Sequence, residues 1–202
     1  MKLNTVERVA MNNPVRAAHQ HRREAQWFRR LTGGGLPDQE VLEVGCGRGV
    51  GVEVILDRLG ARRVTAFDLD PEQVSRAQHR LKSRPGDRVR LAVGDAESIA
   101  HEDASFDAVV DFGILHHVPR WRVAVAEIAR VLRPGGSLIF EEVPRHVLDT
   151  WTFRTFTDHP REDRFEASEF AAELGRHGLH GTGQLHTAVG GLVFVGAAVR
   201  TS

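Results

Sequence analysis

The sequence has little that would support a disulfide-bonded, zinc-binding or membrane-spanning protein. It contains a single cysteine, Cys46, which can form no intrachain disulfide and has no second cysteine with which to build a zinc site. Residues 1–30 carry arginine and histidine but no apolar signal-type core. No stretch approaches the roughly 18 consecutive apolar residues of a transmembrane helix. We therefore expect a soluble, cytoplasmic protein.

The sequence also has no excess of positive or negative charge, and it contains no tyrosine. The 27 Lys and Arg residues equal the 27 Asp and Glu residues, so no global field attracts a polyanion, and we expect no nucleic-acid partner. The absence of tyrosine excludes phenolic side chains as catalytic bases. The chain has 202 residues, of which 41% are hydrophobic. This length and composition predict one globular domain with a sizeable core.

A polar, basic segment precedes this core. Residues 14–31 predict an amphipathic helix, and the glycine-rich residues 32–38 predict a flexible joint. We therefore separate an N-terminal helical extension, residues 1–36, from a main domain, residues 37–202. Two interpretations stay open for the arginines of the extension, a solvated face or a lid over a substrate pocket. These arginines are Arg22, Arg23, Arg29 and Arg30.

From residue 41 onward, short apolar runs alternate with helical patterns, which is typical of a parallel sheet built from βαβ units. In one expected helix, Trp121, Val125, Ile128 and Leu132 recur at helical spacing and predict a buried stripe, followed by a Pro-Gly turn. A small-residue turn near the C-terminus predicts an antiparallel hairpin. The expected strands are 41–45, 63–67, 89–93, 106–112, 137–141, 183–188 and 192–199, and the expected helices are 50–59, 71–82, 121–132 and 167–177.

A glycine loop follows the first expected strand, with glycines at positions 45, 47 and 49 behind Glu43. Glycine permits a tight turn and lets a ligand approach the backbone, and a helix N-terminus behind such a loop favours an anionic group. The dinucleotide fingerprint G-x-G-x-x-G requires a third glycine or alanine at position 50 or 52, and both are valine. The loop is G-x-G-x-G instead.

Acidic residues follow at the ends of the next two expected strands. Asp68 ends the second strand, where a carboxylate can accept hydrogen bonds from both hydroxyls of a ribose. Asp70 precedes Pro71, an order that predicts a helix N-cap with proline at the first helical position. Gly94, Asp95 and Ala96 follow the third strand.

These motifs, with the strand and exit at 105–118 and the Leu-Arg-Pro-Gly-Gly turn and strand within 128–142, resemble class I S-adenosylmethionine-dependent methyltransferases. The glycine–His–His organisation is most similar to the ubiquinone and menaquinone biosynthesis methyltransferase group. The resemblance implies an α/β, Rossmann-like doubly wound fold, with a seven-stranded mixed sheet and an antiparallel last strand. It also implies S-adenosyl-L-methionine as cofactor and S-adenosyl-L-homocysteine as product.

The resemblance further implies roles for individual residues. In the family, the residue matched by Glu43 holds the glycine loop and the methionine moiety, and the Gly-Asp-Ala matched by Asp95 and Ala96 reads adenine. The expected cofactor-binding residues are Glu43, Gly45, Cys46, Gly47, Gly49, Asp68, Leu69, Asp95, Ala96 and Phe112.

His116 and His117 are the catalytic candidates, because the loop after the fourth strand lies beside the transferable methyl group in the family. Histidine titrates near neutral pH, and a base is needed only if the acceptor arrives protonated. We favour His116; the alternative is that one histidine packs and the other orients the loop. Glu141 and Glu142 rank second, and since successive strand residues point oppositely, only one is expected to reach the pocket.

The segment of about 143–180 is where the family inserts substrate-specific structure. Its Trp151, Phe153 and Phe156 either wall a pocket for an apolar acceptor or form a small cluster under a loop. Four histidines of the C-terminal part do not have the spacing of a metal-binding motif, and no metal is expected. They are His159, His177, His180 and His186.

The sequence therefore predicts methyl transfer to an oxygen, nitrogen or carbon nucleophile of a small molecule. One alternative is a non-catalytic S-adenosylmethionine-binding module that regulates or stabilises a partner. A nicotinamide-dependent oxidoreductase is disfavoured by Val50 and by the lack of a Ser/Tyr/Lys catalytic set. Methylation of a macromolecule is disfavoured by the balanced charge.

Overall fold

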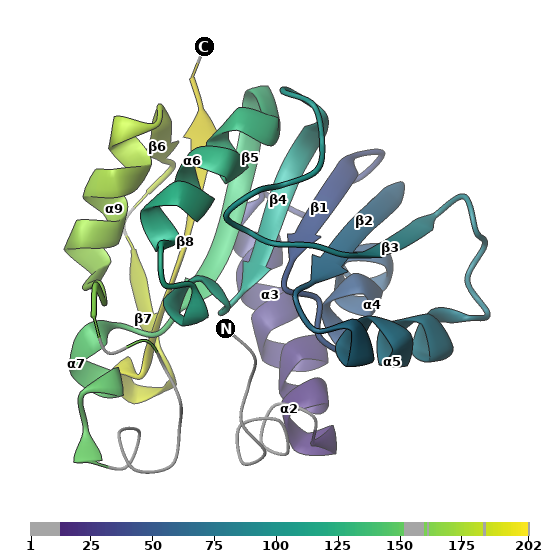
Figure 1. Cartoon of the computed structure of the whole chain (residues 1–202), viewed down its shortest axis with the longest axis horizontal. Coiled ribbons are helices and arrows are strands. Elements are labelled where there is room, and N and C mark those ends of the chain that lie inside the picture. Colours follow the sequence, from purple (N-terminus) through teal and green to yellow (C-terminus); the bar gives the residue numbers. More distant parts are fainter. Residues whose placement is uncertain (1–12, 152–159, 161, 184, 202) are drawn as a thin grey trace.

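A mixed β-sheet forms the centre of the computed structural model, which describes residues 13–151, 160, 162–183 and 185–201 (Figure 1). The strand order is β3-β2-β1-β4-β5-β8-β6, with β7 also paired to β8. Neighbouring strands among β1 to β5 run parallel, and β8 runs antiparallel to β5. The strands are β1 (Glu40–Val44), β2 (Arg63–Asp68), β3 (Val89–Val93), β4 (Phe106–Phe112), β5 (Leu132–Glu142), β6 (Leu179–Gly181), β7 (His186–Ala188) and β8 (Val193–Arg200).

The predicted doubly wound sheet with an antiparallel last strand is confirmed, with one difference at its edge. β6 pairs with residues 198–200 of β8, and β7 pairs with residues 193–195 of the same strand. The two short strands thus share one edge position, so eight strands fill the seven expected positions. The predicted hairpin corresponds to β7 and β8, and β6 was not predicted.

Helices cover both faces of the sheet. Trp121, Val125 and Ile128 of α6 are buried on one face, together with Phe170 and Leu174 of α9. Residues of α3, α4 and α5 pack on the opposite face. The predicted stripe is confirmed, since Trp121, Val125, Ile128 and Leu132 are all buried. The helices of the main domain are α4 (Val50–Asp57), α5 (Pro71–Leu81), α6 (Trp121–Val131), α7 (Arg145–Leu148) and α9 (Ala167–Arg176).

Two local expectations are resolved by backbone geometry. Asp70 caps α5 as predicted, because its side chain accepts a hydrogen bond from the Glu72 amide and Pro71 begins the helix. The Pro-Gly turn at 133–136 is not a free turn but part of β5. The register of β4 against β5 shifts from Phe106↔Leu132 to Ala108↔Ser137, so these residues form a bulge in the strand.

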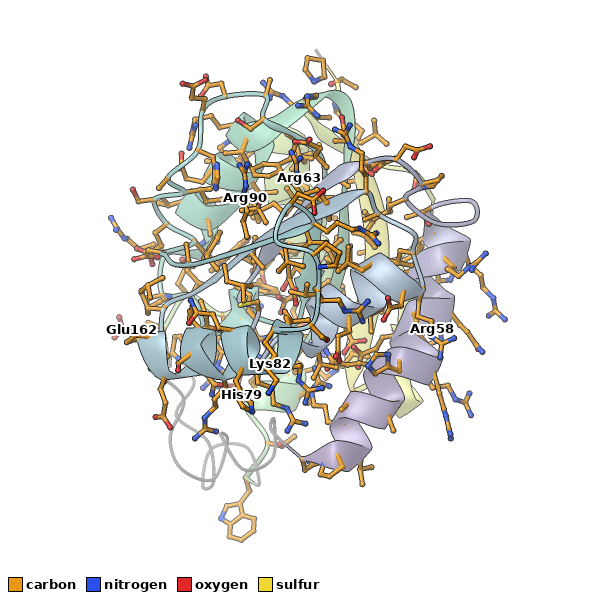
Figure 2. The ribbon with its side chains drawn as sticks, turned by 90° about the vertical axis from the view of Figure 1, so that its right-hand side faces the viewer. Arg58, Arg63, His79, Lys82, Arg90 and Glu162 are labelled. Atoms are coloured by element: carbon orange, nitrogen blue, oxygen red, sulfur yellow. The ribbon has the colours of Figure 1, made fainter. Side chains whose placement is uncertain are left out.

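The N-terminal segment is helical over residues 14–31, with Asn13 as its N-cap. It comprises α2 (Pro14–His19), a π-helical turn η1 (Gln20–Glu24) and α3 (Ala25–Leu31). Phe28 of α3 is buried and stacks on Phe112 of β4, with ring centroids 4.9 Å apart. The Arg29 guanidinium of α3 donates a hydrogen bond to the backbone carbonyl of Arg58. Figure 2 shows Arg58 beside the N-terminal helices.

None of the helices in the described part of the chain is both long enough and apolar enough to cross a membrane.

Candidate functional site

A cavity of about 330 Å³ opens at the carboxyl ends of β1, β2 and β4. The strand order reverses between β1 and β4, and ligands of open α/β sheets bind at this position. The lining includes most residues expected from the glycine loop and the following strand ends, namely Glu43, Gly45, Cys46, Gly47, Asp68, Leu69, Asp95, Ala96 and Phe112. The other lining residues are Arg16, Gln20, Arg48, Val50, Gly51, Phe67, Asp70, Gln73, Gly94, Glu97, Gly113, Ile114, His117, Val118 and Pro119.

The glycine loop is shaped by close contacts that exclude larger residues. Gly45 has φ +69°, and a Cβ there would lie 2.6 Å from Cγ2 of Ile114. Gly49 also has a left-handed φ, but it caps the N-terminus of α4 beside α5 instead of lining the cavity. The expectation that Gly49 touches a ligand is therefore not supported by its position. Its role in this structure is to turn the chain into α4.

Glu43 places a buried carboxyl group in the wall of the cavity. Its side chain is 2% exposed, and its Oε2 atom has no hydrogen-bond partner among the described residues. Burial raises the pKa of Glu43 well above its usual range, and the nearby Asp68 and Asp111 raise it further. A cationic group in the cavity would satisfy this oxygen and favour the charged carboxylate.

Asp68 is held in one orientation by two backbone amides. Its Oδ2 accepts from the Gly47 amide at 2.8 Å, and its Oδ1 accepts from the Asp70 amide at 2.9 Å. Burial raises the pKa of Asp68, while these two hydrogen bonds lower it. The carboxylate therefore ties the glycine loop to the end of β2 and keeps acceptor capacity toward the cavity.

The third strand end adds a polar and an apolar element. Asp95 lines the cavity, and its Oδ1 accepts from the amide of Glu97 at 2.9 Å, which closes a tight Asx-type turn. Ala96 is buried beside it. Three acidic side chains, Glu43, Asp68 and Asp95, thus reach one cavity from the ends of β1, β2 and β3, as the order of motifs in the sequence predicted.

The two histidines after β4 lie differently from the expectation. The side chain of His116 is only 7% exposed and does not line the cavity, and its Nδ1 lies 2.5 Å from Oε2 of Glu142. The side chain of His117 belongs to the cavity wall, and the two rings lie 4.3 Å apart. The position of His117, and not that of the favoured His116, is thus at the cavity. His116 has the orienting position that the alternative reading described.

Glu142 organises the loop that carries these histidines. It is fully buried and accepts backbone hydrogen bonds from Leu115 at 2.6 Å and His116 at 3.2 Å, in addition to the His116 ring. Burial raises the pKa of Glu142 to about 7. Asp111 lies against it, caps the amide of Ile114, and has a pKa raised well above its usual range by burial and by Glu142. From the sequence, Glu142 was named only as a candidate for the pocket, and Asp111 was not singled out.

The expectation that one of Glu141 and Glu142 reaches the pocket is wrong, since neither lines the cavity. They point to opposite faces of β5, as strand geometry requires. Glu141 is 4% exposed and faces Glu24 of the N-terminal segment. Burial, followed by the charge of Glu24, raises the pKa of Glu141 to about 8.

The N-terminal segment contributes cavity residues that sequence reasoning missed. Arg16 and Gln20 line the cavity, and Nη2 of Arg16 donates to the carbonyl of Phe112 at 3.4 Å. The arginines singled out from the sequence are instead exposed. Of the two interpretations, a solvated face or a lid over the pocket, their exposure favours the solvated face. These arginines are Arg22, Arg23, Arg29 and Arg30. Arg48 could have been suspected from its place inside the glycine loop, but Arg16 and Gln20 carry no local signal.

The aromatic residues expected to wall an acceptor pocket are not part of this cavity as described. Trp151 is 75% exposed and is not among the residues that line the cavity. Phe153, Phe156 and His159 lie outside the described residues. Among those described, no group of three or more His, Cys, Asp and Glu side chains could hold a metal ion.

Comparison with known proteins gives a consistent match. Residues 42–140 match the family model described as a methyltransferase domain. The chain is 38% identical over 117 residues to the probable phthiotriol/phenolphthiotriol dimycocerosates methyltransferase 2 of Mycobacterium ulcerans, covering 58% of this chain and 44% of that protein. It is 33% identical over 125 residues to the fatty-acid O-methyltransferase of Mycolicibacterium smegmatis, covering 60% and 43%. The chain thus spans less than half the length of these relatives.

The fold is also similar to a solved structure over nearly the whole of both chains. A SAM-dependent methyltransferase from Aquifex aeolicus superposes with a TM-score of 0.76, covering 98% of this chain and 99% of the other, at 19% sequence identity. At this identity the likeness concerns the fold.

Proposed function

We propose that the chain belongs to the class I S-adenosylmethionine-dependent methyltransferases, binds S-adenosyl-L-methionine and methylates a small-molecule acceptor; the match of residues 42–140 to the methyltransferase domain model supports this. One observation carries the proposal. Glu43 has a buried carboxylate oxygen with no hydrogen-bond partner in the described part of the chain, and it lines the same cavity as Asp68, which two backbone amides orient. A ligand with a cationic end and a diol suits these two groups.

The residues of the cavity fit this cofactor from one end to the other. Glu43 would accept hydrogen bonds from the ammonium group of the methionine moiety, and Asp68 from the ribose hydroxyls. Asp95 would accept from the adenine amine, beside the backbone of Ala96. Leu69 and Phe112 supply apolar surface of the same cavity. When bound, S-adenosylmethionine supplies a methyl group that its sulfonium centre has already activated.

The chain then has to align the acceptor and exclude water, which is the larger part of the work for such a transfer. Gly113, Ile114 and His117 line the cavity at the end of β4, and buried Glu142 and Asp111 hold this loop through its backbone amides. His117 is the group placed to take a proton from an acceptor hydroxyl or amine, and His116 fixes the loop from behind.

For the acceptor we propose an apolar, lipid-type small molecule. Two relatives are named for fatty-acid and for phthiotriol dimycocerosate methylation. Around His117 the cavity wall is made by Ile114, Val118 and Pro119, which suits an alkyl chain better than a charged acceptor.

Calorimetric titration with S-adenosylmethionine, S-adenosylhomocysteine and NAD tests the cofactor. We expect binding of the first two and none of NAD; binding of NAD alone would reject the proposal. A second assay follows formation of S-adenosylhomocysteine with long-chain fatty acids, long-chain alcohols and a polar set of amines and phenols. Turnover confined to the polar set would reject the lipid-type acceptor and leave the cofactor assignment intact. Tight cofactor binding without turnover on any acceptor would favour the non-catalytic module.

A further inference from the structure

The exposed large hydrophobic side chains of the described residues gather at one end of the sheet. Four of the seven belong to three segments at the carboxyl ends of the parallel strands, and two more, Leu69 and Val93, stand at the ends of β2 and β3. Single exposed apolar residues are ordinary in proteins, so the informative feature is their shared position. The four, which we call the apolar rim, are Val15, Trp151, Val189 and Leu192.

Strand pairing places three of these residues beyond the end of β5. Glu142, the last residue of β5, pairs with Phe194, and β8 runs antiparallel to β5. Val189 and Leu192 precede β8, so they lie beyond the carboxyl end of β5. α7 follows the same end of β5, and Trp151 comes shortly after α7. The two segments thus share one end of the sheet although they are distant in sequence.

Val15 joins the apolar rim from α2. Nη2 of Arg48, in the glycine loop after β1, donates to the backbone carbonyl of Asn13 at 3.0 Å, which holds the beginning of α2 at the carboxyl end of the sheet. Val15 is 78% exposed there. Figure 1 shows α2 and α7 at this end of the molecule, toward which the arrows of β1, β2 and β4 point. The cavity opens at the same end.

The turn before β8 presents two apolar side chains in a strained conformation. Val189 has φ +51°, and Gly190 and Gly191 follow with φ +68° and +92°. A β-branched residue is strained in this left-handed region, which asparagine and glycine adopt more readily. Val189 and Leu192 are nevertheless 49% and 47% exposed, so the strain is not offset by full burial within the chain. An apolar phase outside the chain would supply that burial.

The charged side chains near Trp151 pair with one another. Nη2 of Arg145 lies 2.9 Å from Oε2 of Glu169, and Nη1 of Arg164 lies 2.5 Å from Oδ1 of Asp149. These pairs leave the described residues around Trp151 without the excess of positive charge that attracts anionic headgroups. Tryptophan itself is enriched where a lipid layer meets water, since its ring is apolar and its N–H is polar. The combination favours a lipid layer with zwitterionic headgroups.

We propose that the apolar rim docks on a zwitterionic lipid layer and thereby brings the mouth of the cavity to an acceptor dissolved in that layer. The apolar cavity wall of Ile114, Val118 and Pro119 opens at the same end and suits an alkyl chain. An acceptor of low solubility in water is reached most directly from the phase that holds it. The methyl acceptor rests on the proposed function, whereas lipid binding can be measured without it.

Flotation of the full chain with phosphatidylcholine vesicles tests the apolar rim. We expect the wild type to float with the vesicles equally at about 0.1 M and about 0.5 M salt, because apolar burial is not screened by ions. Trp151→Ser, and Val189→Asn combined with Leu192→Ser, should each weaken vesicle binding by at least about tenfold. Asparagine at position 189 also suits the left-handed backbone, so this change leaves the turn itself in place.

Val123→Ser is the matched control, because Val123 is also apolar and exposed but belongs to α6 and not to the rim segments. It should float as the wild type does. The affinity for S-adenosylhomocysteine, measured by calorimetry, should be unchanged in every variant, because no residue of the apolar rim lines the cavity. Unchanged affinity also shows that each variant is folded.

Three results would overturn the lipid surface. The first is a wild-type protein that does not float with vesicles, and the second is one that binds only vesicles containing phosphatidylglycerol and is released by salt. The third is a dimer that Trp151→Ser dissociates, in the absence of vesicle binding, because the apolar rim would then contact a second copy of the chain. Failure of the wild type to bind S-adenosylhomocysteine would instead overturn the proposed function and leave the vesicle result standing.

Discussion

The Nδ1 atom of His116 lies 2.5 Å from Oε2 of Glu142, and this contact turns the ring away from the cavity that His117 lines. The Glu142 carboxylate also accepts hydrogen bonds from the backbone amides of Leu115 and His116 in the same turn. It therefore fixes both the direction of the loop and the placement of its histidines. We therefore expect the buried His116 to stabilise the loop and His117, in the cavity wall, to be the histidine that affects catalysis.

The two histidines should therefore respond differently to substitution. His117→Asn is expected to lower kcat by about 100-fold or more on an acceptor that must lose a proton, with little change in thermal stability. His116→Asn is expected to lower the free energy of unfolding by about 1–3 kcal/mol, because Glu142 loses a buried partner. Steady-state kinetics and chemical denaturation of both variants check this. The reverse pattern, with activity lost only in His116→Asn, would return the catalytic role to His116.

Asp68 should carry a large part of the cofactor affinity. Asp68→Ala removes an acceptor that can bind two ribose hydroxyls and releases the glycine loop from the end of β2, so we expect the affinity for S-adenosylhomocysteine to fall by about 100-fold or more. Calorimetry measures this directly. Asp57→Ala, at a partly exposed carboxylate at the far end of α4, is the control and should bind as the wild type does. Equal affinities in all three proteins would remove Asp68 from the site.

Buried acids should make the protein less stable as the pH rises. Burial raises the pKa of Glu24 to about 7, although the charge of Arg16 and a hydrogen bond with Gln20 lower it. Burial, followed by the charge of Glu24, raises the pKa of Glu141 to about 8; Arg16 and His19 oppose this shift, and Asp111 adds to it. Between about pH 5 and pH 8 the folded state holds protons that the unfolded state has lost. The free energy of unfolding must then decrease with rising pH.

Denaturation at pH 6 and pH 8 checks the sign. The wild type should be less stable at pH 8, and Glu141→Gln should show a smaller difference, because a neutral amide carries no desolvation cost that varies with pH. Glu102→Gln, at an exposed position, should keep the wild-type dependence. Stability that increases from pH 6 to pH 8 in the wild type would contradict the assignment of buried protons to these acids.

Local patterns were sufficient for most of the fold. β1 to β4 fall within a residue of the expected strands, because each is an apolar run closed by glycine or an acidic residue. β6 escaped prediction because its three residues, Leu179–Gly181, show no alternation. The bulge in β5 escaped as well, since its Pro-Gly-Gly residues have the composition of a turn and are drawn into the strand only by pairing with β4.

Prediction of the site failed where a side chain is placed by a partner distant in sequence. Glu43, Asp68 and Asp95 end strands that can be recognised locally, and all three line the cavity. His116 and His117 are adjacent in one short turn, and which of them faces the cavity depends on Glu142, on the neighbouring strand. Arg16 reaches the cavity because Phe28 anchors its helical segment on Phe112, a long-range contact with no local signal.

Gly51 offers the sharpest steric test of the site, because it lies outside the three-glycine motif. A Cβ there would lie 2.0 Å from Oε1 of Glu43 and 2.7 Å from the Phe112 ring, both of which are buried. Gly51→Ala should therefore displace Glu43, weaken S-adenosylhomocysteine binding by at least about tenfold, and cost about 1–3 kcal/mol of stability. The matched control is Gly175→Ala in α9, where a Cβ meets nothing within 4 Å. It should stabilise the protein by about 0.5–1 kcal/mol through helix propensity alone. Calorimetry and denaturation of the two variants separate the outcomes, and a Gly51→Ala protein with unaltered affinity would show that the position of Glu43 is irrelevant to the ligand.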